Sequence, residues 1–188
     1  MQQCSNGGMS LRRQAAYFGV LTALALIFSY VETFIPVPIG IPGIKIGLAN
    51  LVVVIALYKM DILSAYILAV LRVVLAGFLF GNLFSILYSL AGSLLSVSVM
   101  FLLKKTDLFS VVGISFGGGV AHNLGQLIVA AVVVESYNVF YYVPVLIIAG
   151  LLTGAAIGFA AREMLKRLQK LLISVSYTHL TLPTILRV

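Results

Sequence analysis

Arg72 is the residue whose position in the sequence most strongly predicts a site. It lies ten residues into an apolar run, 62–80, which at about 1.5 Å per helical residue puts it ~15 Å into a membrane. The free energy of inserting an arginine at that depth is roughly +2.5–3.5 kcal/mol on insertion scales. Its side chain should therefore face other helices and have a partner. Glu32, Glu135, a backbone carbonyl and an anionic ligand are the candidate partners. An internal structural pair and a ligand contact both remain open.

A second polar group lies in the apolar run 108–134. His122 and Gln126 are four residues apart and share a helix face, and Asn123 lies beside them. Three consecutive glycines, 117–119, precede them and weaken a helix by about 1 kcal/mol each relative to alanine, so we expect a helix break there. The dipole of a helix restarting after the break would favour an anionic group. Interhelical hydrogen bonding that fixes packing is the alternative.

The segment 36–50 contains three prolines and several glycines before a short apolar run, so it cannot be a regular helix. The backbone N–H and C=O groups of an irregular segment near the membrane core must form hydrogen bonds with other protein groups or line a water-filled cavity. We predict an outer cap over 36–44, with Lys45 and Asn50 below it. The alternative is an exposed loop in which Lys45 is an interfacial anchor.

The elements that must position these residues are transmembrane helices. The 188 residues are 62% hydrophobic and 9% charged, with mean hydropathy +1.16, whereas soluble domains carry about 25% charged residues. The sequence therefore predicts an all-α membrane protein, a compact bundle of six spans. The predicted spans are Gln14–Phe34, Ile46–Tyr58, Ile62–Phe80, Leu83–Leu103, Leu108–Val134 and Val139–Ala161.

The positive charges predict the orientation of these spans. With the N-terminus inside, nine basic residues fall on the inner side and only Lys45 on the outer side. Both termini are then cytoplasmic, and the net charge of +7 is explained without a nucleic-acid partner. The inner residues are Arg12, Arg13, Lys59, Lys104, Lys105, Arg162, Lys166, Arg167 and Lys170.

The domain organisation follows from the same pattern. We expect a disordered segment over 1–11 and a single membrane domain over 12–173, ending in a basic cytoplasmic helical extension. Residues 174–188 resemble a translated sequencing adapter and are expected to be non-native. Cys4, the single cysteine, excludes an internal disulfide and a multi-cysteine metal site, and His122 has no nearby carboxylate. We predict no metal site and no cofactor.

Small residues recur every four positions on two of the predicted spans. One set is Ala15, Gly19 and Ala23; the other is Gly150, Gly154 and Gly158. Such stripes let helices approach closely, mostly within one chain. The first stripe is also a candidate surface for docking another membrane subunit.

The string Lys45-Ile-Gly-Leu-Ala-Asn50, with Arg72 and the segment 122–126, resembles the Gx transporter family. Its members are often labelled heptaprenyl diphosphate synthase component I. The family is similar to the substrate-binding S components of energy-coupling-factor transporters, six-helix proteins that capture a vitamin-sized ligand from outside beneath a first-loop lid. The resemblance implies a multi-pass protein of the bacterial plasma membrane. It also implies docking through Ala15, Gly19 and Ala23 to a transmembrane coupling subunit driven by ATPases, although those proteins favour alanine where this stripe has glycine.

We therefore expect a solute-capture subunit for transport of a vitamin-, quinone- or isoprenoid-like ligand. Its predicted ligand-binding residues are Lys45, Asn50, Arg72, His122, Asn123 and Gln126. The alternative is a non-catalytic accessory subunit that holds a polyprenyl synthase at the membrane. A membrane enzyme with His122 as its base is a third, weaker hypothesis.

The enzymatic label can be tested against the acidic residues. Prenyl diphosphate synthesis needs carboxylate clusters that hold magnesium on diphosphate oxygens. The five acidic residues are dispersed along the chain, and neither an aspartate-rich motif nor a nucleotide-binding glycine loop with lysine is present. We do not expect catalysis by that mechanism. The acidic residues are Glu32, Asp61, Asp107, Glu135 and Glu163.

Overall fold

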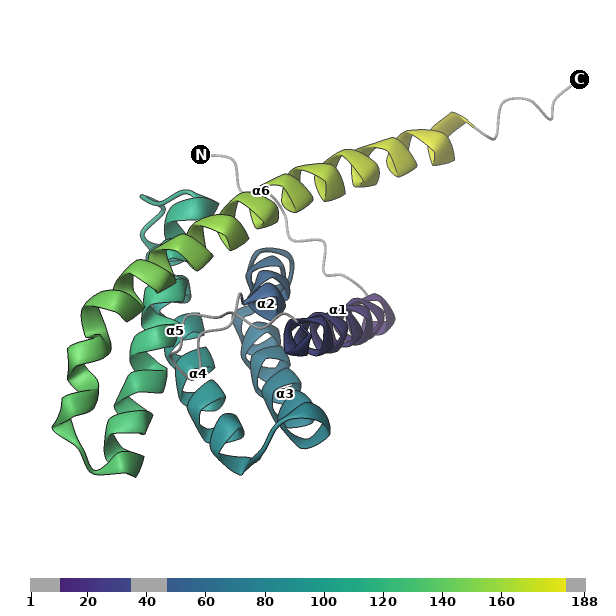
Figure 1. Ribbon diagram of the computed structural model, residues 1–188. Coiled ribbons are helices and arrows are strands. Elements are labelled where there is room, and N and C mark those ends of the chain that lie inside the picture. Colours follow the sequence, from purple (N-terminus) through teal and green to yellow (C-terminus); the bar gives the residue numbers. More distant parts are fainter. Residues whose placement is uncertain (1–10, 35–46, 182–188) are drawn as a thin grey trace, which may run out of the picture.

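The computed structural model describes residues 11–34 and 47–181, with side chains described for 12, 14–34 and 47–170. Within these ranges the chain is helical and contains no strand. Six α-helices and one 3₁₀ helix follow one another along the chain (Figure 1). They are α1 (Leu11–Thr33), α2 (Leu48–Lys59), α3 (Ile62–Phe80), α4 (Leu83–Lys105), α5 (Val111–Val134), η1 (Tyr137–Tyr142) and α6 (Val143–Thr181).

Five of the helical segments are long and apolar enough to cross a membrane: 14–33, 62–80, 83–105, 111–134 and 137–170. The chain is thus a multi-pass membrane protein. The sequence predicted six spans, but α2 has only 12 residues and covers about 18 Å, well short of a ~30 Å hydrocarbon core.

Helix α2 is buried by the other helices. Its residues 51–57 are all buried, and they form the centre of the hydrophobic core. Helices α1, α3 and α6 pack around it (Figure 1). A helix that is apolar on every face is suited to such a position, because no side of it needs water.

Both ends of α2 are bound by charged side chains from other helices. At its start, the backbone N–H of Leu48 donates to Oε1 of Glu32 on α1. At its end, Nζ of Lys104 on α4 donates to the carbonyl of Leu57 at 2.5 Å and lies 4.8 Å from the ring centre of Tyr58. An anion at the N-terminus and a cation at the C-terminus complement the helix dipole. Helices α1 and α4 therefore each supply a hydrogen bond to one end of this short helix.

Replacing Lys104 with methionine should remove the cap at the end of α2. Because the lost hydrogen bond involves a charged, partly buried group, we expect the protein to lose about 1–2 kcal/mol of stability. Thermal unfolding in detergent measures this loss. Lys105→Met is the matched control, because Lys105 is exposed and has the same charge at the next position. Equal unfolding temperatures for the two variants would contradict the assignment.

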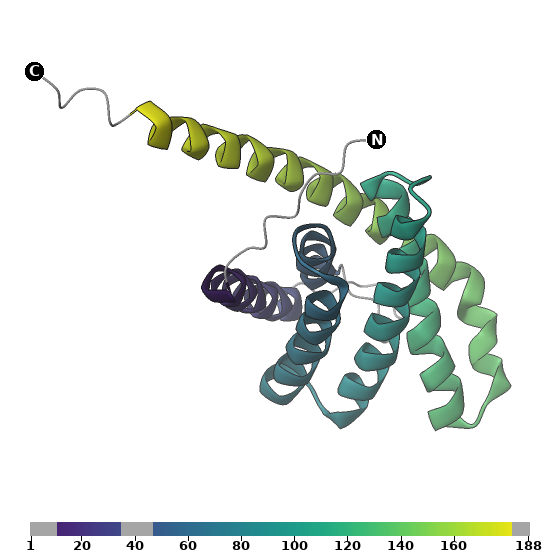
Figure 2. The same ribbon diagram turned by 180° about the vertical axis from the view of Figure 1, so that it is seen from behind.

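Helices α3 to α6 lie side by side in chain order (Figures 1 and 2). The predicted helix break was wrong, since α5 runs unbroken from Val111 to Val134. The glycines of α5 and α6 instead allow close contact. A Cβ added to Gly119 would lie 2.3 Å from the carbonyl oxygen of Gly150, and one added to Gly154 would lie 2.6 Å from that of Ser115. Packing by small residues has overridden the low helix propensity of glycine.

The sixth span also differs from its predicted bounds. The segment 137–142 is a 3₁₀ helix, and α6 begins at Val143 and continues to Thr181, into the segment predicted to be non-native. Beyond residue 160, one side of α6 packs on the core through Ala161, Leu165 and the partly buried Met164 and Leu168. The basic residues 162, 166, 167 and 170 are exposed on the other sides. The extension therefore continues the sixth helix, and Figure 2 shows it running beyond the other helices.

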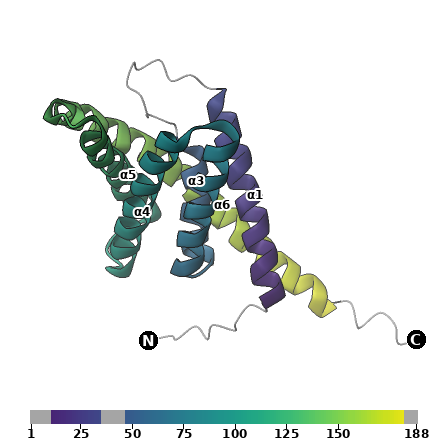
Figure 3. The same ribbon diagram turned by 90° about the horizontal axis from the view of Figure 1, so that it is seen from below.

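Helix α1 crosses the other helices steeply: Figure 1 shows it nearly end-on and Figure 3 shows it lengthwise. It packs on the core through Ala25 and the partly buried Leu21, Leu24 and Phe28. Its opposite stripe is exposed, and no heavy atom lies within 4 Å of a Cβ built on Gly19. Residue 11, predicted to be disordered, is the first residue of this helix; residues 1–10 lie outside the described ranges.

Candidate functional site

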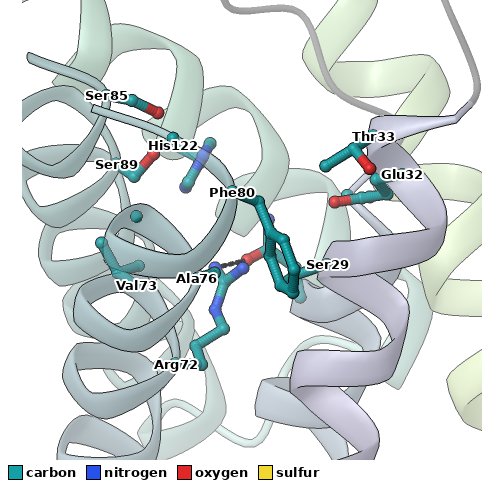
Figure 4. A pocket seen from close by; sticks show the side chains of 14 residues that line it. Ser29, Glu32, Thr33, Arg72, Val73, Ala76, Phe80, Ser85, Ser89 and His122 are labelled. Carbon is teal, nitrogen blue, oxygen red and sulfur yellow. Dashed lines mark hydrogen bonds between the residues drawn. The ribbon is translucent and has the colours of Figure 1, made fainter.

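A cavity of about 90 Å³ lies where α1 and α3 end and where α2 and α4 begin (Figure 4). The middle of α5 completes its wall. Glycines and small or apolar residues of α3 line part of it, together with the ring of Phe80. Its polar lining consists of Ser29, Glu32, Thr33, Asn50, Arg72, Ser85, Ser89 and His122.

Arg72 supplies the positive charge of the cavity. Its side chain is only 8% exposed, and its Nη2 donates to Oδ1 of Asn50 at 2.5 Å and to Oγ of Ser93 at 3.1 Å. Its buried Nε has no hydrogen-bond acceptor among the described residues. In the described part of the chain, the groups that bind Arg72 are therefore an amide on α2 and a hydroxyl on α4, both neutral.

Glu32 supplies a negative charge on the α1 side of the same cavity. Figure 4 shows its carboxylate and Arg72 on separate helices that face each other across the space. One carboxylate oxygen of Glu32 accepts from the backbone N–H of Leu48 at the start of α2. Glu135, the other acidic candidate, is exposed at the end of α5. Among the described residues, one cation and one anion thus line the cavity.

His122 reaches the cavity because α4 and α5 approach closely at Gly92. A Cβ on Gly92 would lie 2.8 Å from the carbonyl oxygen of His122 and 3.1 Å from its ring. Gln126 packs against the same glycine, and its side chain does not line the cavity. Asn123 points to α6 instead, where its Nδ2 donates to the carbonyl of Leu146 at 2.8 Å.

The structure therefore brings three of the six predicted ligand-binding residues together: Asn50, Arg72 and His122. Asn123 and Gln126 lie in helix contacts, and Lys45 and the cap 36–44 lie outside the described residues. Whether any of them contacts a ligand stays a prediction.

Sequence reasoning missed the serines of α4. Ser85 and Ser89 line the cavity, Ser93 binds Arg72, and Ser96 donates to the carbonyl of Gly118 at 2.8 Å. They recur every three or four residues and so lie on one helix face. That spacing was the available signal, and it marks the side of α4 that faces α3 and α5.

The arrangement is suited to binding a group that accepts hydrogen bonds. A buried guanidinium, several hydroxyls, an imidazole and the Glu32 carboxylate line the space beside glycines and apolar side chains, so a polar group can form hydrogen bonds there. Among the described residues, no three His, Cys, Asp or Glu side chains lie close enough together to hold a metal ion. The described residues of the site can therefore bind a ligand through hydrogen bonds and electrostatic attraction.

The fold and the cavity define a class: a multi-pass helical membrane protein with a small polar cavity among its helices. The chain belongs to the heptaprenyl diphosphate synthase component I family, whose model matches residues 21–164. The match includes every residue that lines the cavity. No curated protein and no solved structure matches the chain.

Proposed function

We propose that this chain is the ligand-binding subunit of a membrane transport system, similar in role to the S components of energy-coupling-factor transporters. The observation that carries the proposal is the environment of Arg72, a buried cation whose two hydrogen-bond partners among the described residues are neutral. Removing a charge from water costs several kcal/mol unless it is well paired. A ligand that brings hydrogen-bond acceptors into the cavity would lower that cost.

The positive-inside pattern supports capture from the outer side. The basic residues at the ends of α2 and α4 mark the inner side, and the cavity lies toward the opposite ends of these helices. In this proposal the protein lies in the bacterial plasma membrane and the cavity opens in the outer half. The segment 36–44 would act as its cap, with Lys45 as an additional cation for the ligand.

The exposed stripe of α1 supports docking to a second membrane subunit. Ala15, Gly19 and Ala23 are exposed, and Gly19 leaves open space beside the helix. Small residues allow another helix to approach closely. In this proposal the partner is a transmembrane coupling subunit with ATPases, which would supply the energy for transport.

The test is mass spectrometry of small molecules that co-purify with the chain in mild detergent. We expect one bound vitamin-, quinone- or isoprenoid-like species per chain, and we expect Asn50→Leu to lose it, because the variant removes both a lining group and the acceptor of Arg72. Asn138→Leu, at an exposed residue of η1, is the control and should retain the ligand. Equal retention by both variants would contradict the cavity as the site.

The family name favours a second candidate function, because "component I" implies a partner component of heptaprenyl diphosphate synthase. In this reading the chain holds a soluble polyprenyl synthase at the membrane and is not itself catalytic. Stoichiometric co-purification with such a synthase would support it. So would unchanged synthase activity when Arg72 or His122 is replaced.

A further inference from the structure

The cavity is too small for a whole ligand of the proposed kind. Binding sites for drug-sized molecules commonly have volumes of roughly 300–1,000 Å³, whereas this cavity has about 90 Å³. The space therefore admits one group of such a ligand and not its whole body. A larger ligand would place one polar group here and the rest of its body elsewhere.

Phe80 forms part of the cavity wall between α1 and α3 (Figure 4). Its side chain is also 42% exposed, so this part of the wall lies near the protein surface. The ring of Tyr30 on α1 lies 5.0 Å from that of Phe80 and is 46% exposed. Because these are side chains, rotation of Phe80 and Tyr30 can open this wall without moving a helix.

The surface outside this wall is apolar. Phe34, which follows α1 and whose ring packs against that of Tyr30, is 66% exposed, and Val31 on α1 is exposed as well. In a chain with five candidate spans, exposed apolar side chains of this size are suited to lipid. A ligand body that leaves the cavity here would therefore enter hydrocarbon.

We propose that the ligand is a membrane-dissolved amphiphile. Its oxygen-bearing head binds Arg72 in the cavity, and its apolar body passes between α1 and α3, beside Tyr30 and Phe80, into the lipid. This inference rests on the proposed ligand-binding function and adds the class of ligand and its path. An oxygen-rich head fits because, among the described residues, Nη2 of Arg72 donates to Asn50 and Ser93, whereas its buried Nε has no acceptor.

The absence of tryptophan from the sequence allows a direct test of the path. Phe34→Trp places one fluorophore next to Tyr30, whose ring lies 4.8 Å from that of Phe34, without altering a residue that lines the cavity. Phe159→Trp on α6, 59% exposed, is the matched control. Each variant is reconstituted in phosphatidylcholine nanodiscs and titrated with dodecyl phosphate brominated in its chain, since bromine quenches tryptophan on contact.

We expect saturable quenching of Phe34→Trp by a third or more, and only weak, linear quenching of Phe159→Trp. Binding of radiolabelled dodecyl phosphate to the unsubstituted chain should weaken at least tenfold in Arg72→Met. Ser89→Val, which alters the cavity without removing a charge, should also weaken binding and covers the case in which Arg72→Met does not fold.

The outcomes separate the two levels of the proposal. Binding that depends on Arg72 without quenching at position 34 would overturn the path and leave the proposed function standing. Displacement by inorganic phosphate at the same concentrations as dodecyl phosphate would show a site for free anions and overturn the amphiphile. Binding that is unchanged in both cavity variants would overturn the proposed function as well.

Discussion

Replacing Arg72 with methionine is expected to weaken binding of the co-purifying ligand about tenfold or more, while the protein still inserts and folds. A hydrogen bond to a charged group contributes about 1.5–3 kcal/mol, and each 1.4 kcal/mol corresponds to a factor of ten in affinity. Methionine fills similar space and has no donor. The measurement is a dissociation constant in nanodiscs, together with gel filtration to check that the variant is folded.

The stability of the Arg72→Met variant should change little. The substitution leaves Asn50 and Ser93 without their donor, which is destabilising, but it also removes a charge that is costly to bury. Because the two effects oppose each other, we expect a net change within about 2 kcal/mol. A loss of binding in a folded variant would then report on ligand contact.

Arg167→Met is the control for the loss of one positive charge. The side chain of Arg167 is 76% exposed and pairs with Glu163 one helical turn away, at 3.0 Å. Exposed pairs of this kind contribute about 0–1 kcal/mol, so neither binding nor stability should change measurably. If Arg72→Met and Arg167→Met bind the ligand equally well, Arg72 is a structural residue and the cavity does not bind this ligand.

The sequence predicted Arg72 and its burial because an arginine inside an apolar run has few alternatives. It did not predict which groups would bind it. The position of Asn50 after the proline-rich segment places it near the site, whereas Ser93 is recognisable only as one member of the regularly spaced serines of α4. Which serine accepts from Arg72 depends on how α3 packs against α4, and that packing is determined by many residues of both helices.

The polar group on α5 shows a second limit. His122, Asn123 and Gln126 are neighbours on one helix, but successive residues of a helix point about 100° apart. Two helices pack on different sides of α5: α4 meets it at Gly92, and α6 accepts the hydrogen bond of Asn123. Only the structure assigns each side chain to its neighbour. The same packing explains why the glycines did not break the helix.

Those glycines carry the second large expected effect: Gly119→Leu should prevent folding or lower stability by more than about 3 kcal/mol. Overpacking a well-filled core typically costs 1–3 kcal/mol, and here the obstacle is backbone, which cannot rotate away. A Cβ at this position would lie 2.3 Å from the carbonyl oxygen of Gly150 and 3.2 Å from Cα of Gly154. Helices α5 and α6 would have to separate. Thermal unfolding and the yield of monodisperse protein measure the effect.

Gly19→Leu is the matched control, with the same substitution at a helix position that has open space. It should fold with unchanged or slightly higher stability, because leucine favours helix over glycine by roughly 0.5–1 kcal/mol. The control also bears on the docking proposal. If a partner helix approaches α1 at Ala15, Gly19 and Ala23, a leucine there will hold it away, and the folded variant will no longer co-purify with that partner. If the folded Gly19→Leu variant still co-purifies with the partner, the docking surface does not include this stripe of α1. Equal stability of the two leucine variants would instead contradict the close contact of α5 with α6.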